Sequence, residues 1–188
     1  IGLIGTRPAY EAMKEADTVL LIGTSFPFTG FLPKEAKTIQ LDIDPTQIGK
    51  RTKVDVGLAG DTKMTLDWLT REISRKNKRT FLERCQENMK EWWARMDAEE
   101  GEIAVPLKPQ HVIRELRKVT EDDAVLSVDV GNVTVWMARN FRITNQDFIV
   151  SSWLATLGCG LPGAIAAKIA YPRRQAITVC GDGGFGMT

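Results

Sequence analysis

Apolar runs and amphipathic helical stretches alternate along the first part of the chain. Positions 18–23 form a continuous apolar run, which is typical of a strand buried on both faces of a parallel sheet. Other stretches carry apolar residues at helical spacing, and Asp61 precedes one of them as a helix N-cap. This alternation predicts parallel α/β winding over residues 1–75. The predicted strands are residues 18–23, 38–44 and 54–61, and the predicted helices are residues 8–16 and 64–73.

A second alternation of the same kind occupies residues 109–188, with a highly charged stretch between the two. That stretch, residues 76–108, has apolar residues at helical spacing and is predicted to be a linker helix whose apolar stripe packs on a neighbour. The predicted fold class is therefore α/β, with parts of two parallel-sheet domains joined by a helical linker. The stripe consists of Phe81, Leu82, Cys85, Met89, Trp92, Trp93 and Met96. The later strands are predicted at residues 124–131, 147–152 and 177–180, and the later helices at 110–119, 134–141 and 161–171.

Composition narrows the class of protein. Apolar residues make up 43% of the 188 residues, which is enough for packed cores, and the net charge of +1 argues against a nucleic-acid binder. No apolar run is long enough to span a bilayer, and no signal peptide opens the chain. The three widely spaced cysteines predict neither a disulfide framework nor a zinc site, so we expect a protein of the reducing cytoplasm. His111 is the only histidine and has no nucleophile beside it, which argues against triad chemistry.

The sequence VCGDGGF carries the strongest chemical signal. The strand predicted at residues 177–180 delivers Asp182 to the carboxyl edge of a sheet, where ligands of α/β proteins bind. The flanking glycines, Gly183 and Gly184 among them, let an anion approach the backbone, and a single carboxylate suits Mg²⁺. These features predict a magnesium–diphosphate site with Asp182 as the metal ligand. An ordinary tight turn, with Asp182 capping the next helix, is the alternative.

The same motif gives the chain a family resemblance. Gly181-Asp182-Gly183, together with residues 153–188 and the sequence VDVGNVTVWMAR, resembles the thiamine-diphosphate enzymes of the pyruvate oxidase and acetolactate synthase family. The resemblance covers nearly the whole chain. It implies the second half of an FAD-binding middle domain (1–75), a linker (76–108) and the N-terminal part of the thiamine-diphosphate-binding domain (109–188). The chain begins without methionine and stops directly after a glycine turn, so we expect a fragment of a longer protein.

The resemblance also implies roles for single residues of the thiamine site. Leu157 falls where the family places a large apolar side chain that bends the two rings of the cofactor, although many flavin-containing members have methionine there. In the adjoining segment, which includes Thr156, Ala155 would offer its carbonyl and Leu157 its N–H to the pyrimidine. Asn132, with Val133, follows another predicted strand and is expected to line the same pocket. For Cys159 and Gly160 we favour plain helix–strand packing.

A flavin site is predicted in the first half. The sequences IGLIGTRP, GTSFPF and LDID resemble FAD segments of the family, and two of them follow predicted strands, where loops meet ligands. An aspartate at a strand end can accept hydrogen bonds from an adenosine group. This half lacks G-x-G-x-x-G, which argues against an NAD-type site, whereas a domain that has lost its cofactor is the alternative. The predicted FAD contacts are Ile1, Gly2, Leu3, Ile4, Thr24, Ser25, Phe26, Pro27, Phe28 and Asp42.

The implied reaction is oxidative decarboxylation of pyruvate with thiamine diphosphate, Mg²⁺ and FAD. Phosphate and O₂ would be the other substrates, and acetyl phosphate, CO₂ and hydrogen peroxide the products; a sister subgroup passes electrons to a membrane quinone. In the family a second subunit supplies the activating glutamate, which implies a homo-oligomer, a dimer or tetramer. No catalytic side chain is assigned within the chain, so the fragment alone is expected to be inactive. An acetolactate synthase-type carboligase and a non-catalytic nucleotide-binding module are the alternatives.

Overall fold

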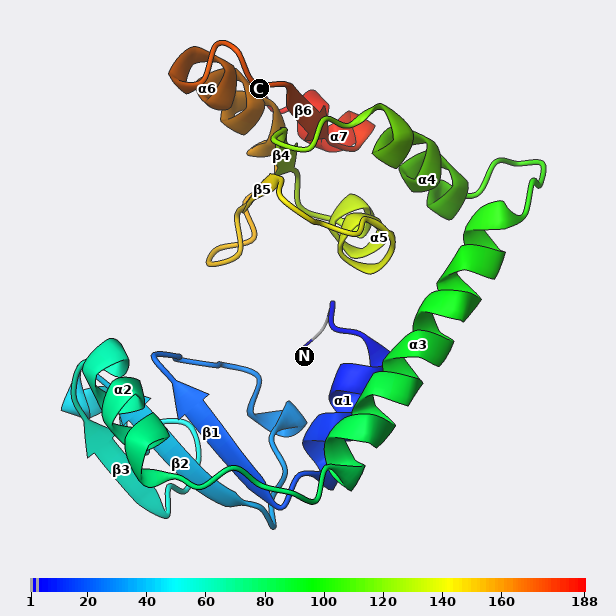
Figure 1. The fold of residues 1–188 in the computed structure, drawn as a ribbon. Coiled ribbons are helices and arrows are strands. Elements are labelled where there is room, and N and C mark those ends of the chain that lie inside the picture. The colour runs from blue at the N-terminus through cyan, green and yellow to red at the C-terminus, as the bar shows by residue number, and fades with distance from the viewer. Residues whose placement is uncertain (1, 3) are drawn as a thin grey trace. The chain divides into compact units, whose positions relative to one another are not determined.

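The computed structural model describes residue 2 and residues 4–188. The chain divides into two compact units, Ile1–Trp92 and Trp93–Thr188, and each contains one three-stranded sheet with helices. All strand pairs in both sheets are parallel (Figure 1). The predicted α/β fold class, with two parallel sheets, is therefore confirmed.

In the first unit the strands lie in chain order, and β2 is the central and most buried strand. Leu41 on β2 is fully buried, and Val19 on β1 is also buried. Local signals set the helix starts, since Pro8 stands in the first turn of α1 and the Asp61 side chain accepts the Met64 N–H at the start of α2. The elements are α1 (Arg7–Glu15), β1 (Thr18–Ile22), η1 (Thr29–Phe31), β2 (Lys37–Asp42), η2 (Pro45–Gln47), β3 (Val56–Ala59) and α2 (Thr62–Glu72).

In the second unit the strand order is β5-β4-β6, so the connection from β5 to β6 crosses over β4. Helices consequently cover both faces of this sheet (Figure 1). On one face, Leu126 and Val128 of β4 pack with Ile113 of α4 and Met137 of α5. On the other face, Ser127 lies against α6. The elements are α4 (Pro109–Val119), β4 (Val125–Val128), α5 (Asn132–Asn140), β5 (Asp147–Val150), α6 (Gly160–Ala170), β6 (Ala176–Val179) and α7 (Asp182–Phe185).

Helix α3 (Thr80–Gly101) is the predicted linker helix, and the boundary between the two units falls within it. Its apolar stripe is only partly packed. Met96 is buried, as predicted, whereas Phe81 and Leu82 are exposed in this chain, so the packing of these two residues on a neighbour stays a prediction. Near the end of the same helix Glu100 is buried although it belongs to a charged run, because it pairs with an arginine of α4.

Three further predictions concern residues that the structure describes. None of the helices in the described part of the chain is both long and apolar enough to cross a membrane. Cys85, Cys159 and Cys180 are free thiols in the described part of the chain. Strand β6 ends at Val179, so Cys180 lies just beyond the strand that was expected to contain it, and it is half-buried.

Candidate functional site

Three loops of the second unit meet at the carboxyl edge of its sheet. They follow β4, β5 and β6, and because these neighbouring strands are parallel, all three loops leave the sheet on the same side. Every residue predicted for the thiamine site lies on one of these loops or at the start of the helix that follows it. Asn132 begins α5, residues 155–157 precede α6, and Asp182 begins α7.

Asp129 stands where the three loops converge, and the sequence-based prediction missed it. It directly follows β4 and is 1% exposed. Its carboxylate accepts the N–H of Gly158 at 2.9 and 3.1 Å and the N–H of Val130 at 2.7 Å. Its own N–H donates to the Val179 carbonyl at 2.9 Å, and its carbonyl accepts the Thr134 hydroxyl at 2.6 Å. One residue therefore connects the ends of β4 and β6, the start of α5 and the loop before α6.

Glycines make room for this carboxylate. Gly158 has a φ of +84°, the left-handed conformation that favours glycine. A Cβ at Gly160 would lie 3.0 Å from Asp129 Cβ, and one at Gly184 would lie 2.4 Å from Asp129 Oδ2. At Gly163 a Cβ would lie 2.3 Å from Ser127 Oγ. The run from Gly158 to Gly163 thus has G-x-G-x-x-G spacing before a helix, with one glycine for the turn and two for close approach, and this spacing is the signal that could have located the site.

Asp182, the predicted metal ligand, is exposed at the first position of α7. No atom lies within 4 Å of a Cβ built at Gly181 or Gly183, so there is open space on both sides of the aspartate. Gly184, in contrast, is buried against Asp129. The described residues contain no group of three or more His, Cys, Asp or Glu side chains that could hold a metal. A lone carboxylate beside open backbone fits Mg²⁺, which takes one or two protein carboxylates and completes its shell with phosphate and water.

The loop before α6 has an unusual backbone. Ala155 has a φ of +51°, and it is the one non-glycine residue among those described with a positive φ. This conformation costs a residue other than glycine about 1–2 kcal/mol, so the surroundings must impose it. The Thr156 N–H donates to Ser151 Oγ at 3.2 Å, and the Leu157 side chain is 51% exposed at the sheet edge. Leu157 is thus open to a ligand, whereas Val133 is buried in the core and lines no open surface, contrary to expectation.

The predicted flavin residues gather at the carboxyl edge of the first sheet. The loop after β1 and residue Asp42 at the end of β2 are neighbours, since Gly23 N–H donates to Leu41 O at 2.9 Å. Asp42 is buried and its Oδ1 accepts the Asp44 N–H at 3.0 Å. Within the loop, Thr24 Oγ1 accepts the Phe26 N–H at 3.2 Å.

An exposed apolar surface adjoins this loop. Gly2 has a φ of +100°, and a Cβ there would lie 3.6 Å from the Phe28 ring. Phe28 and Ile4 are exposed, and Phe28 packs edge-to-face with Phe26. Close backbone approach, exposed apolar side chains and a carboxylate at a strand end fit a flavin nucleotide. Ser25 and Pro27 lie on the same loop, while Ile1 and Leu3 lie outside the described residues.

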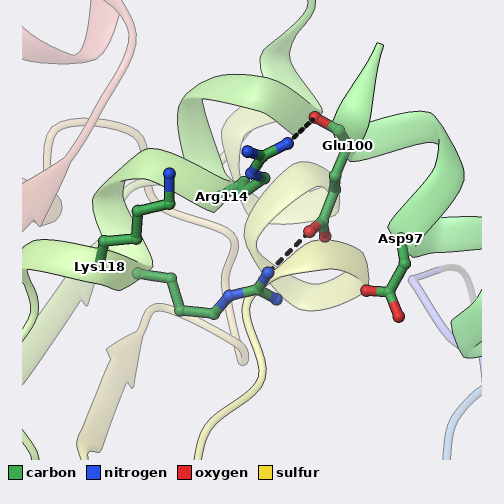
Figure 2. Close-up of a pocket in the computed structure, with 5 residues that line it drawn as sticks. Asp97, Glu100, Arg114 and Lys118 are labelled. Carbon is green, nitrogen blue, oxygen red and sulfur yellow. Dashed lines mark hydrogen bonds and ion pairs between the residues drawn. The ribbon is translucent and has the colours of Figure 1, made fainter.

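A separate polar cavity of about 380 Å³ lies between α3 and α4 (Figure 2). It is lined by Asp97, Glu100, Arg114, Arg117 and Lys118, none of which was predicted as a site residue. Arg117 donates to Glu100 Oε2 at 2.7 Å and to the Asn140 carbonyl at 3.0 Å, and Arg114 donates to the Glu100 carbonyl at 3.4 Å. These contacts tie α3 to α4 and α5, which is a structural function.

Two family models match the chain. Residues 1–69 match the central domain of thiamine pyrophosphate enzymes, and residues 129–188 match their C-terminal TPP-binding domain. A Bacillus subtilis (strain 168) protein, named as thiamine pyrophosphate-containing, is 58% identical over 100% of this chain and 33% of its own length. The pyruvate oxidase of Lactiplantibacillus plantarum is 36% identical over 98% of this chain and 31% of its own. A Methanocaldococcus jannaschii protein named for the acetolactate synthase large subunit is 37% identical over 100% and 34%. The chain thus spans about a third of the length of these relatives.

Proposed function

Because this chain belongs to the thiamine pyrophosphate enzyme family, we propose that its full-length protein catalyses the oxidative decarboxylation of pyruvate with thiamine diphosphate, Mg²⁺ and FAD. The observation that carries the proposal is the convergence of three sheet-edge loops on the Asp129 carboxylate, which brings the predicted thiamine-site residues to one edge. The likeness to a pyruvate oxidase supports the choice of reaction.

Different residues of the second unit bind different parts of the thiamine diphosphate and its metal ion in this proposal. When bound, thiamine diphosphate supplies an electron sink for decarboxylation and FAD an acceptor for two electrons. Asp182 holds the magnesium ion, and the open backbone at Gly183 admits the diphosphate. The exposed Leu157 side chain supports the rings, and the backbone groups of Ala155 and Leu157 orient the pyrimidine. Asn132 lines the same edge from the start of α5.

The first unit holds FAD in this proposal. The loop from Thr24 to Phe28 contacts the flavin nucleotide, with Gly2 and Ile4 beside it, and Asp42 accepts hydrogen bonds from the adenosine part. Phosphate and O₂ are the further substrates, which give acetyl phosphate, CO₂ and hydrogen peroxide. The protein works as a homo-oligomer, a dimer or tetramer, in the cytoplasm, and meets the membrane only if a quinone replaces O₂ as acceptor.

An acetolactate synthase reaction, in which two keto acids are joined, is the second candidate. The specific observation in its favour is sequence identity, since the acetolactate synthase-type relative is 37% identical to this chain and the pyruvate oxidase 36%. Sequence identities this similar do not distinguish the two reactions, so the reaction products have to be measured.

The test uses the full-length protein purified with its flavin and supplied with Mg²⁺, thiamine diphosphate and pyruvate. We expect hydrogen peroxide in proportion to CO₂, and acetyl phosphate only when phosphate is present. Acetolactate without peroxide would establish the second candidate instead. A protein that binds no thiamine diphosphate in the presence of Mg²⁺ would contradict both reactions and favour a non-catalytic nucleotide-binding module.

A further inference from the structure

Burying the carboxylate of Asp129 at this position costs free energy. Asp129 is 1% exposed, and among the described residues its oxygens accept from the N–H groups of Val130 and Gly158 and from the Cys159 thiol, not from a Lys, Arg or His. Burying an unpaired charge is costly, and here backbone N–H groups provide the compensation. If the position needed only packing, an apolar side chain of similar volume would serve at lower cost. The carboxylate must therefore be explained by what it holds in place.

The first thing it holds is the loop before α6. The Gly158 N–H points at both carboxylate oxygens from a left-handed backbone. Because the preceding peptide bond is planar, this contact turns the carbonyl of Leu157 away from Asp129 and sets where the Leu157 side chain begins. The strained Ala155 lies only three residues earlier, so the loop is restrained at Gly158 and, through Ser151, at Thr156.

The second thing it holds is the start of α7. Gly184 is buried against Asp129 Oδ2, so closely that an added Cβ would be 2.4 Å from that oxygen. Asp182 stands two residues before Gly184 in the same short helix. The position of the carboxylate thus sets how closely the turn that carries Asp182 approaches the loop that carries Leu157.

We propose that Asp129 is a positioning residue for the bound cofactor, which holds the ring-supporting loop (residues 155–158) and the metal-binding turn (residues 181–184) in register through its buried carboxylate. The inference rests on the proposed thiamine-diphosphate site and adds a residue that does not itself touch the cofactor. The residue acts through the Gly158 N–H and the Gly184 backbone.

The test is Asp129→Asn in the full-length protein, with Asp122→Asn as control, because Asp122 is exposed before β4, at the opposite end of that strand. The dissociation constant of thiamine diphosphate is measured at two Mg²⁺ concentrations, together with the thermal unfolding of the cofactor-free protein. We expect Asp129→Asn to raise the dissociation constant of thiamine diphosphate by about 10- to 100-fold, which is the usual effect of replacing a residue that supports a metal site. Raised Mg²⁺ should restore only part of the affinity lost in Asp129→Asn, because the ring-supporting loop is displaced together with the metal-binding turn.

Unchanged affinity in folded Asp129→Asn would overturn the inference, and so would full rescue by Mg²⁺. If Asp129→Asn does not fold, Gly184→Ala tests the same contact from the other side. This variant keeps the Asp129 carboxylate and its hydrogen bonds, and its added methyl group, 2.4 Å from Asp129 Oδ2, should displace the metal-binding turn and weaken thiamine diphosphate binding. Unchanged affinity in folded Gly184→Ala would contradict the contact. The readout is cofactor affinity, so a wild-type protein that forms acetolactate would refute the proposed reaction and leave this inference standing.

Discussion

The buried ion pair between α3 and α4 offers the most quantitative prediction. The Glu100 side chain is 1% exposed and the Arg117 side chain 26% exposed, and the distance between Glu100 Oε2 and Arg117 Nη2 is 2.7 Å. Glu100 is therefore cut off from water, whereas Arg117 still reaches it. We consider three variants, Arg117→Met, Glu100→Met and the double replacement, which keep side-chain volume similar while removing one charge or both.

The expected magnitudes follow from the burial of each partner. At 2.7 Å and an effective dielectric constant of 20 the gross attraction is about 6 kcal/mol, and the desolvation of the two ions offsets most of it. Arg117→Met leaves Glu100 buried and unpaired, which should cost about 3–5 kcal/mol. Glu100→Met should cost only about 1–2 kcal/mol, because Arg117 still reaches water and the Asn140 carbonyl. The double variant should be less destabilised than Arg117→Met.

Hydrogen exchange of the α4 amides in the full-length protein measures the free energy of local opening of α4. This measurement does not assume two-state unfolding of a large protein. Since about 1.4 kcal/mol is tenfold in an equilibrium, Arg117→Met should speed exchange by about 2 to 3.5 orders of magnitude. Equal effects of the two single variants, or a double variant as unstable as the sum of both, would refute the assignment of the cost to the unpaired Glu100.

The remaining predictions concern the two sites and the packing of α6. Asp182→Asn should lower thiamine diphosphate affinity and activity together, with partial rescue by Mg²⁺ and unchanged thermal stability, because asparagine serves a turn nearly as well as aspartate; unchanged affinity would support the plain turn. Asp42→Ala should reduce bound flavin, followed by visible absorbance, more than it reduces thiamine diphosphate affinity, while Asp44→Ala, which leaves that carboxylate in place, should not. Gly163→Ala should destabilise by about 1–3 kcal/mol through its clash with Ser127 Oγ, and added Ser127→Ala should recover much of this in thermal unfolding; no recovery would place the strain elsewhere.

The sequence alone determined the elements and the fold class. A continuous apolar run marked β1, and helical spacing with a capping aspartate at Asp61 marked α2, because both signals are local and need no knowledge of distant contacts. The motif around Asp182 was likewise found from the sequence, since a strand followed by Gly-Asp-Gly is a contiguous pattern. Those features depend only on neighbours along the chain.

Only the tertiary structure decided the strand order and the function of buried charges. Asp129 belongs to a stretch that the sequence pattern predicts as the end of a strand, and its partner Gly158 lies 29 residues away, so no local pattern could connect them. Glu100 belongs to a charged run that predicts a solvated helix, yet α4 brings Arg117 against it and buries it. In both cases a charged side chain is buried because a segment distant in the sequence donates hydrogen bonds to it. These donors come within reach only when the sheet order β5-β4-β6 and the packing of α4 have formed.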